Sequence, residues 1–231
     1  MRPAAPEPAL LAMTPLFAGL SLEELTQFAG FMHKRTFSAG ASFLTLGQPG
    51  EAIYVLLTGS VKVSTIMPDG TEVILAVLGA GEVVGEMSLA DSLGRSADVT
   101  TLEETTLLWM DRTAFRSGVV QSPVLARNLA EILSRRLRLA NANLLSLAAL
   151  DVPGRVASQI LALAREYGEQ RPEGLRIPMR LTQADLAGLV GASRVRVNQA
   201  FGYLRKRNAI SVGADGRITV LDEEILSRRA G

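Results

Sequence analysis

The stretch VLARNLAEILSRRLRLANANLLSLAALDV, residues 124–152, contains neither glycine nor proline, although Pro123 precedes it and Pro153-Gly154 follows it. Such a run predicts one long helix. At about 1.5 Å per residue this helix would be roughly 40 Å long, which is more than one small domain needs to cover a face. We therefore expect it to serve as a connecting rod between domains.

Apolar residues recur along two sides of this predicted helix. One set recurs at steps of three and four: Leu129, Leu133, Leu137, Ala140, Leu144 and Leu147. A second set recurs at steps of seven: Leu125, Ile132 and Leu139. One stripe can pack on the helix's own domain and the other on a second copy of the chain, as in a two-stranded coiled coil. We expect a homodimer, and the alternative is a buried helix of one large monomer. Asn141 and Asn143 interrupt the stripes and either fix the register or offer an amide to a ligand.

Composition limits the classes of function. The 231 residues are enough for two domains, and 48% hydrophobic with 20% charged residues indicates a globular protein. The net charge of +1 means that affinity for nucleic acid must come from a local basic patch. There is no cysteine and only one histidine, His33, which excludes a disulfide framework, thiolate-held metals and a histidine-based triad. The apolar run Ala9–Met13 is too short for a secretory signal and no run approaches a membrane span, so we expect a cytoplasmic protein without membrane contact.

The first part of the chain has the pattern of a β-domain. Ser21-Leu22-Glu23-Glu24 is a capping box that opens a short helix. From about Arg35 the apolar period changes to two, and Met67-Pro68-Asp69-Gly70 is a hairpin turn. The segment Thr105–Met110 is the expected last strand, before a short helical lead at Asp111–Gly118. Many short strands with close turns predict a jelly-roll.

One segment, Gly81–Leu89 followed by Arg95-Ser96-Ala97, breaks the alternation. Gly85 permits a tight turn, and the next residues can form one helical turn with free N–H groups. Arg95 and Ser96 offer donors to a phosphate, and Glu86 can accept from a sugar hydroxyl. These groups suit a small phosphorylated sugar, whereas the alternative is a turn held by an internal Glu86–Arg95 salt bridge. The residues alone leave both interpretations open.

The boundary to a second domain is Leu150–Arg155, where Pro153 cannot continue a helix and Gly154 permits a bend. The next helix ends near Gly168, Gln170–Gly174 is a loop, and Leu175–Met179 is short and extended. A capping box at Thr182–Asp185 then opens a helix that ends at Gly191, and Ser193 caps a second helix that runs to about Arg207. Ile210–Val212 and Arg217–Val220 form a hairpin, and Asp222 caps a last helix. This order is typical of a helix-turn-helix with a wing.

The second helix of this pair has an apolar and a polar side. Val197, Ala200, Phe201 and Leu204 share the side expected to face inward. The opposite side carries Val195, Asn198, Gln199, Gly202 and Lys206, with Arg194 at its edge. Between Arg176 and Arg207 the basic residues are Arg176, Arg180, Arg194, Arg196, Arg205, Lys206 and Arg207, against the single acid Asp185. This concentration favours DNA binding, and the alternative is a basic helix that contacts protein.

The stretch from Gly85-Glu86-Met87-Ser88-Leu89 through Arg95-Ser96-Ala97 resembles the phosphate-binding cassette of the cyclic-AMP receptor protein (CRP/FNR) family of transcription regulators. The similarity continues through Arg135-Arg136-Leu137, Leu150–Arg155 and Gly191–Arg194. It implies an α+β chain with a cyclic-nucleotide-binding jelly-roll at 1–121, a dimerisation helix at 122–150 and a winged helix at 151–231. It also implies contact with RNA polymerase.

The resemblance assigns roles to individual residues. Glu86 would bind the ribose 2′-hydroxyl, and Arg95 and Ser96 would hold the cyclic phosphate. The nucleotide site would comprise Gly85, Glu86, Met87, Ser88, Arg95, Ser96, Ala97, Arg136 and Asn141. The DNA-binding set would comprise Thr182, Ser193, Arg194, Val195, Arg196, Asn198, Gln199 and Lys206.

Departures from the family pattern bear on specificity. Ala140-Asn141 stands where the best-known cyclic-AMP members have Thr-Ser, although the Asn141 amide can still bond a base edge. Of the three base-reading positions Arg194 is kept and suits guanine, whereas Val195 and Gln199 replace Glu and Arg. We therefore expect a two-fold symmetric DNA site with a guanine opposite Arg194 and altered neighbours.

The function expected from the sequence is a homodimeric transcription regulator controlled allosterically by a cyclic nucleotide, with cyclic AMP as the first choice. The first alternative keeps the fold but needs no effector or uses another small molecule. A haem or iron-sulfur sensor and an enzyme are the remaining alternatives. The absence of cysteine argues against the haem or iron-sulfur sensor. We find no nucleophile–base pair, metal-ligand cluster or Walker-type loop, which argues against the enzyme.

Overall fold

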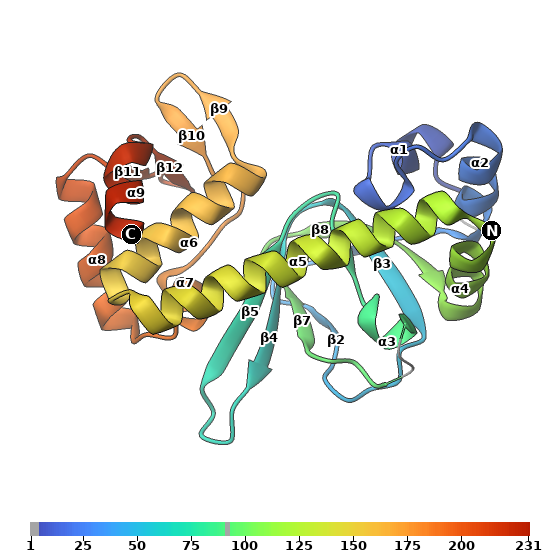
Figure 1. The fold of residues 1–231 in the computed structure, drawn as a ribbon, viewed down its shortest axis with the longest axis horizontal. Coiled ribbons are helices and arrows are strands. Elements are labelled where there is room, and N and C mark those ends of the chain that lie inside the picture. The colour runs from blue at the N-terminus through green and yellow to red at the C-terminus, as the bar shows by residue number, and fades with distance from the viewer. Residues whose placement is uncertain (1–4, 91–92) are drawn as a thin grey trace. The chain divides into compact units, whose positions relative to one another are not determined.

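The computed structural model of the chain describes residues 5–90 and 93–231. The chain divides into two compact units. The first comprises the chain up to Thr65 together with Val77–Arg138, and the second comprises Ile66–Ala76 together with Leu139–Gly231. The long helix α5 (Pro123–Ala149) contributes residues to both units (Figure 1).

Short helices open the first unit: α1 (Pro8–Ala12), the 3₁₀ turn η1 (Pro15–Phe17) and α2 (Leu22–Phe31). Helix α2 begins at the expected capping box, in which the Ser21 hydroxyl accepts from the Glu24 N–H at 3.2 Å and the Glu24 carboxylate accepts from the Ser21 N–H at 2.8 Å. The proline-rich segment before Pro15, to which its sequence gives no clear structure, contributes Leu11 to the core, and Leu16 and Phe17 follow it there.

Two four-stranded sheets form the expected β-roll, in the orders β1-β8-β3-β6 and β2-β7-β4-β5. The strands are β1 (His33–Phe37), β2 (Ser42–Leu44), β3 (Ala52–Thr58), β4 (Val61–Ile66), β5 (Glu72–Leu78), β6 (Val83–Val84), β7 (Asp98–Thr101) and β8 (Thr105–Asp111). The hairpin turn between β4 and β5 is confirmed, because the Gly70 N–H donates to the Met67 carbonyl at 2.9 Å and Gly70 has φ +83°. A positive φ is available to glycine without a steric cost.

The core of the first unit lies between one face of the first sheet and the helices. Val55, Leu108 and Met110 from the strands pack with Phe28 of α2 and Phe115 of α4 (Arg112–Gln121). Leu125 and Ile132 of α5 join the same cluster. Two residues of the seven-residue stripe therefore pack on the helix's own unit, as one of the two expected stripes should, whereas its third residue, Leu139, is 39% exposed.

The C-terminal part of the other stripe stays exposed, whereas Leu129 packs partly buried against the core of the first unit and Leu133 is half-buried. Leu137, Leu144 and Leu147 are 62%, 66% and 46% exposed, and Ala140 is exposed between them. Large apolar side chains in a row on one helix face are typical of a surface that binds another chain.

The bend after α5 differs from the expectation. Helix α5 ends at Ala149, and α6 (Val152–Tyr167) begins directly after Asp151. The Asp151 carboxylate caps α6 by accepting from the Gly154 N–H at 2.9 Å. The predicted bend at Pro153-Gly154 is therefore wrong: Pro153 lies in the first turn of α6, where its missing N–H has no partner to lose. The bend lies at Leu150-Asp151 instead.

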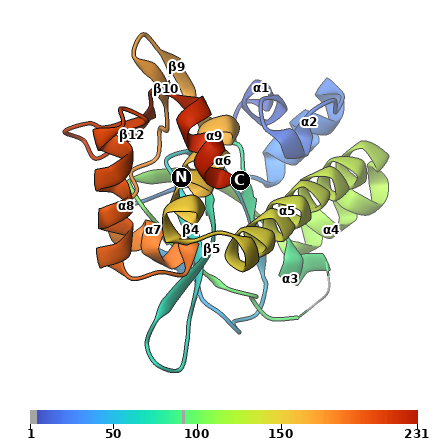
Figure 2. The ribbon, with the colours of Figure 1, turned by 60° about the vertical axis from the view of Figure 1, so that its left-hand side comes forward.

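The second unit contains the expected helix-turn-helix and wing (Figure 2). Its further elements are β9 (Glu169–Arg171), β10 (Gly174–Arg176), α7 (Gln183–Val190), α8 (Arg194–Lys206), β11 (Ile210–Val212), β12 (Ile218–Val220) and α9 (Glu223–Ala230). Helix α6 contacts α7, α8 and α9 and supports all of them. The sheet order is β11-β12-β10-β9. The loop expected at Gln170–Gly174 is wrong in part, since β9 pairs Arg171 with Gly174 of β10.

The caps expected in this unit are confirmed. Thr182 and Asp185 form a capping box on α7, and Gly191 ends that helix with φ +58°. The Ser193 hydroxyl caps α8 by accepting from the Arg196 N–H, and Asp222 caps α9. Short polar side chains at these positions satisfy N–H groups that the helix itself leaves free.

Candidate functional sites

The first site is built around a sharp turn at Gly85. Strand β6 ends at Val84, Gly85 has φ +86°, and the one-turn helix α3 (Met87–Ala90) follows. A Cβ at Gly85 would lie 2.5 Å from Nη1 of Arg95 and 3.1 Å from the Ala52 carbonyl oxygen. Both the backbone conformation and the close approach of Arg95 therefore require glycine here.

Arg95 is held firmly beside this turn, and its side chain is almost completely buried, at 5% exposed. Its Nη1 donates to the Gly85 carbonyl at 2.9 Å and to the Ser88 hydroxyl at 2.8 Å, and its Nη2 donates to the Ala52 carbonyl at 2.7 Å. Burial lowers the pKa of the Arg95 guanidinium, which nearby Tyr54 and Glu86 partly oppose. Arginine keeps its charge in proteins, so a cation is fixed at the edge of the roll.

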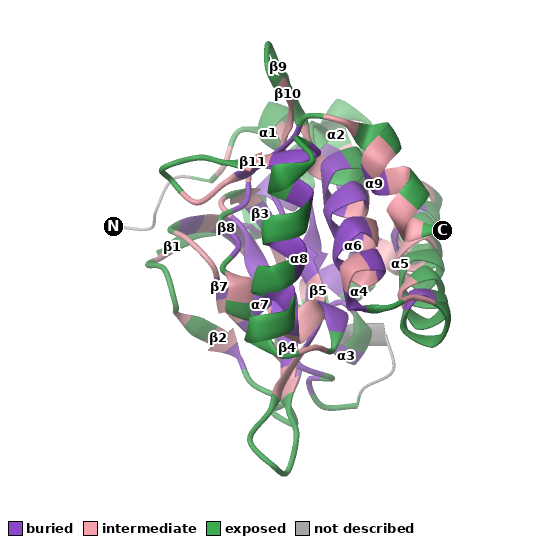
Figure 3. Ribbon diagram, turned by 90° about the vertical axis from the view of Figure 1, so that its left-hand side faces the viewer, coloured by how far each residue is buried: buried purple, intermediate pink, exposed green. Residues whose placement is uncertain are grey.

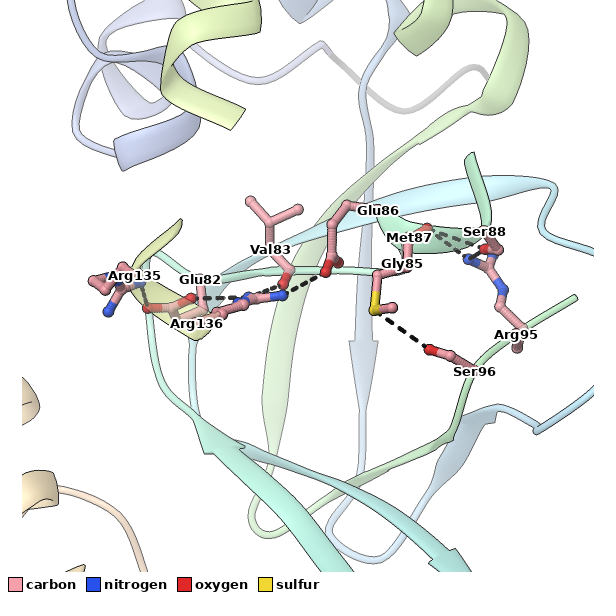
Figure 4. Close-up of polar contacts among 10 residues, drawn as sticks. All are labelled: Glu82, Val83, Gly85, Glu86, Met87, Ser88, Arg95, Ser96, Arg135 and Arg136. Carbon is pink, nitrogen blue, oxygen red and sulfur yellow. Dashed lines mark hydrogen bonds and ion pairs between the residues drawn. The ribbon is translucent and has the colours of Figure 1, made fainter. Parts of the chain in front are cut away.

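Ser96 and Met87 lie beside this cation. Figure 4 shows the Ser96 hydroxyl directed at the Met87 sulfur, and the two atoms are 3.6 Å apart. Both residues are exposed, whereas Ala97 is buried and leads into β7. A sulfur is a weak acceptor, so a stronger acceptor such as a phosphate oxygen can take the hydroxyl proton from it.

A network of ion pairs joins the turn to α5. Arg136 Nη1 donates to the Glu86 carboxylate at 2.7 Å, and its Nη2 donates to the Glu82 carboxylate at 2.9 Å and to the Val83 carbonyl. Arg135 binds the second oxygen of Glu82. Figure 4 shows this chain of contacts from Arg135 to Glu86. Removing one partner from a buried ion pair costs about 3–5 kcal/mol, so α5 is tied strongly to this turn.

The charges in this network support each other's ionisation. Burial acts to raise the pKa of the Glu82 carboxyl. Arg135 and Arg136 outweigh this effect through their hydrogen bonds and their charges, and they hold the pKa below its ordinary value. Burial likewise disfavours charge on Arg136, and Glu86 and Glu82 outweigh it and raise its pKa. Sequence reasoning missed Glu82 and Arg135. The signal available was two acids four residues apart and two adjacent arginines on a distant helix.

The partners of Glu86 and Arg95 bear on the alternative interpretation of the turn. Glu86 is bonded to Arg136, while Arg95 is bonded to Gly85, Ser88 and Ala52. The internal Glu86–Arg95 salt bridge considered as an alternative is therefore wrong. Gly85, Glu86, Met87, Ser88, Arg95, Ser96 and Arg136 come together as expected. Asn141 is exposed and lies five residues beyond Arg136 on α5.

The second site is the outer side of α8. Val197, Ala200, Phe201 and Leu204 are buried, as expected. Figure 3 shows the outer side of α8 as exposed. The exposed residues expected to contact DNA are Ser193, Arg194, Val195, Arg196, Asn198, Gln199 and Lys206, with Thr182 exposed at the start of α7. This surface carries three cations and two amides and no acid, so it suits a polyanion whose edges carry hydrogen-bonding groups.

Within residues 5–90 and 93–231 there is no group of three or more metal-ligating His, Asp or Glu side chains. Over the same ranges no helix is long and apolar enough to cross a membrane.

Comparison with known proteins gives matches to both units. The family model of the cyclic nucleotide-binding domain matches residues 34–122, and that of the Crp-like helix-turn-helix domain matches residues 154–229. The chain is 36% identical over 221 residues to the CRP-like cAMP-activated global transcriptional regulator of Mycobacterium tuberculosis, covering 96% of this chain and 98% of that protein.

Solved structures give the same fold. FixK2 from Bradyrhizobium japonicum matches with a TM-score of 0.77 at 19% identity, covering 87% of this chain and 98% of that one. CLP from Xanthomonas campestris, described as a c-di-GMP responsive global regulator, matches with a TM-score of 0.69 at 25% identity, covering 87% and 99%. The family is one of transcription regulators rather than enzymes. A cyclic nucleotide-binding domain followed by a Crp-like helix-turn-helix, in a chain similar over nearly its whole length to such a regulator, places this protein in the CRP/FNR-type family of transcription regulators.

Proposed function

We propose that the protein is a homodimeric regulator whose affinity for a two-fold symmetric DNA site is controlled by cyclic AMP bound beside Gly85. The observation that carries this proposal is the fixed Arg95 cation next to the exposed Ser96 hydroxyl, with Glu86 on the other side of Gly85. An arginine fork and a hydroxyl suit a cyclic phosphate, and a carboxylate suits a ribose hydroxyl. The similarity to a cAMP-activated regulator supports cyclic AMP as the first choice.

The control acts through α5. Arg136 ties Glu86 to this helix, so a ligand that hydrogen-bonds Glu86 also changes the partners of Arg136. A ligand shifts an equilibrium between helix arrangements by its difference in affinity for them. In a dimer formed through Leu137, Leu144 and Leu147, that shift sets the spacing of the two α8 helices. Two such helices need to lie about 34 Å apart, one turn of DNA, to read one face of a duplex.

The test is titration calorimetry of the full chain with cyclic AMP, cyclic GMP and cyclic di-GMP. We expect cyclic AMP to bind at micromolar concentration, and Arg95→Gln and Ser96→Ala to weaken binding about tenfold or more, since each removes a hydrogen bond to an anion. The thermal unfolding midpoint of each variant shows whether it is folded, and Ser96, which is exposed, is the variant whose fold is least at risk. Absence of cyclic AMP binding by the folded wild-type chain would contradict the proposal.

Two observations support a second function, in which the effector is a different cyclic nucleotide or none is needed. Ala140 is exposed on α5, where a hydroxyl would be expected for contact with adenine, and a similar structure belongs to a c-di-GMP responsive regulator. In this case the same site takes a different cyclic nucleotide, or the protein binds DNA without one. The same calorimetry separates these cases: tighter binding of cyclic di-GMP than of cyclic AMP, or no binding of any nucleotide by a chain that still binds DNA, would favour this second function.

A further inference from the structure

A pair of amide side chains joins α5 to α6 close to the bend between them. Nε2 of Gln159 on α6 donates to Oδ1 of Asn143 on α5. Asn143 is half-buried, and Gln159 is 7% exposed. Each residue lies about two turns from the bend at Leu150-Asp151, so the side chains meet only within a limited range of angles between the helices. If both amides turn over together, the bond reverses its direction but still joins α5 to α6.

Apolar contacts hold α6 to the other helices of the winged helix domain. Val156, Ile160 and Leu163 are buried, and α6 contacts α7, α8 and α9. These helices therefore move with α6. The bond between Asn143 and Gln159 is polar by contrast, and one hydrogen bond changes an equilibrium by only about two- to tenfold. The angle between α5 and α6 is therefore easier to change than the packing of α6 on α7, α8 and α9.

Two polar groups on the same sides of these helices are buried without a partner. Ser146 lies three residues after Asn143 and is 8% exposed, and Arg155 lies four residues before Gln159. Ser146 Oγ and Arg155 Nε are buried and lack a hydrogen-bond partner among the residues that the structure describes. A buried polar atom without a partner disfavours the arrangement that buries it, by roughly fivefold or more. The present angle is therefore favoured by the Asn143–Gln159 bond and disfavoured by these two groups.

We propose that Asn143 and Gln159 form a clamp, which holds α5 and α6 in one of two arrangements of similar stability. Ser146 and Arg155 oppose the clamp, because a change of angle can give their buried atoms a partner. When opposing contributions are of similar size, a ligand needs only a modest difference in affinity to shift the equilibrium. The clamp therefore sets the fraction of chains in the DNA-binding arrangement before any nucleotide binds. This inference deepens the proposed function and rests on it for the link to DNA.

The test is the distance between α5 and the winged helix domain, measured by pulsed electron spin resonance in the full chain. The chain contains no cysteine, so spin labels attach only where Ala142→Cys and Gln170→Cys place them. Both positions are exposed, one on α5 and the other on β9. Mixing with an excess of unlabelled chain leaves one labelled copy in each dimer. We expect two distances in the nucleotide-free chain, one for each arrangement.

Substitutions on the two sides of this balance should have opposite effects. Gln159→Ala and Asn143→Ala should each lower the ratio of clamped to unclamped chains by about two- to tenfold, the effect of one hydrogen bond. The double variant should lower it no further, because both residues act through the same bond. Ser146→Ala should raise the ratio, since it removes a group that the clamped arrangement leaves without a partner. Ser134→Ala replaces an exposed serine of the same helix and should leave the ratio unchanged.

The same variants show whether the clamp has only a structural role. The thermal unfolding midpoint of each variant shows that it is folded. Gln159→Ala and Ser146→Ala that shift the ratio in the same direction would overturn the proposal. So would a single distance that none of these substitutions changes.

DNA binding links the clamp to the proposed function. In the nucleotide-free chain, Gln159→Ala and Ser146→Ala should change the dissociation constant for the selected DNA site in opposite directions. Opposite shifts in distance without opposite shifts in DNA affinity would contradict the part that the clamp plays in the switch. A wild-type chain that binds neither DNA nor cyclic AMP contradicts the proposed function, while the distances still decide on the clamp. A chain that binds both, but whose distances ignore these substitutions, contradicts the clamp alone.

Discussion

At the scale of single residues, the proposed nucleotide site depends on close contacts between Gly85 and Arg95. Gly85 adopts a backbone conformation suited to glycine and also makes space for the Arg95 guanidinium. Arg95 in turn holds the Gly85 carbonyl, so the turn and the cation fix one another. The residues that would meet a phosphate are therefore positioned by the fold itself.

Gly85→Ala tests this arrangement. A Cβ at this position would lie 2.5 Å from Arg95 Nη1 and would face the Ala52 carbonyl, so Arg95 has to move. We expect loss of cyclic nucleotide affinity by about tenfold or more, together with destabilisation of about 1–3 kcal/mol from the strained backbone. Gly70→Ala is the matched control: it also replaces a glycine of positive φ, but a Cβ there meets nothing within 4 Å. Equal nucleotide affinity in both variants would contradict the account.

The Glu82 network predicts a pH dependence of stability. The pKa of Glu82 is held below its ordinary value of 4.5 by Arg135 and Arg136, against the effect of burial. A lowered pKa in the folded state gives stability that is present above about pH 4.5 and is lost as the pH falls through the folded-state value. We expect Glu82→Gln to be less stable than the wild type at pH 7, and the difference to shrink as the pH is lowered below 4.5. Urea unfolding from pH 7 to pH 3 measures it, and a difference that stays constant with pH would be evidence against the ion pairs.

At the scale of elements, local signals were predicted well from the sequence. The capping boxes at Ser21 and Thr182 and the caps at Ser193 and Asp222 depend on residues within one turn, and each formed as expected. The position of the bend after α5 was not predicted, because Pro153 is compatible both with ending a helix and with beginning one. Asp151 caps α6, so Pro153 lies at the beginning of that helix.

The contacts among distant residues could not be read from the sequence. Glu82 and Arg135 are 53 residues apart, and neither carries a local signal that names its partner. The same holds for Asn143 and Gln159, which lie 16 residues apart on different helices. Such pairs depend on how the elements pack. The composition of Gly81–Leu89 and Arg95–Ala97 predicted a site at the turn, but it did not predict these pairs.

The Asp151 side chain at the bend makes two contacts, one with α6 and one with the C-terminal helix. The Asp151 carboxylate caps α6 and also binds Arg229 of α9. We expect Asp151→Ala to cost about 1 kcal/mol, as loss of an N-cap does, and Arg229→Ala to cost less, because the ion pair is exposed. Chemical unfolding of the two variants measures this order. A greater loss for Arg229→Ala would mean that the ion pair, rather than the cap, holds the start of α6.

The exposed stripe of α5 predicts the assembly state. Replacing Leu144 and Leu147 with glutamate places two charges in the surface proposed to pair with a second copy, and burying unpaired charges is costly. We expect the double variant to sediment as a monomer in analytical ultracentrifugation at micromolar concentration, where the wild type sediments as a dimer. Ala142→Glu, which is exposed on another side of α5, is the control and should remain dimeric. A wild type that is monomeric at these concentrations would contradict the dimer.

At the scale of the whole molecule, the proposed switch consists of a nucleotide site, helix α5 and the DNA-binding surface of α8. Arg136 connects the turn at Gly85 to α5, and α5 continues to Ala149, one residue before the bend that precedes α6. A change at the nucleotide therefore has a covalent and hydrogen-bonded route to the winged helix. Coupling of this kind between two binding sites is typically about 1–3 kcal/mol, which corresponds to a change in affinity of roughly 5- to 150-fold.

The most direct test of this switch is the dissociation constant of the full chain for its selected DNA site, measured by fluorescence anisotropy at increasing cyclic AMP. The account predicts that cyclic AMP tightens DNA binding by at least about fivefold for the wild type, and that Ser96→Ala shifts this response to higher nucleotide concentration. DNA binding that is specific but equally tight at every concentration of cyclic AMP, in a chain that calorimetry shows to bind the nucleotide, would contradict it.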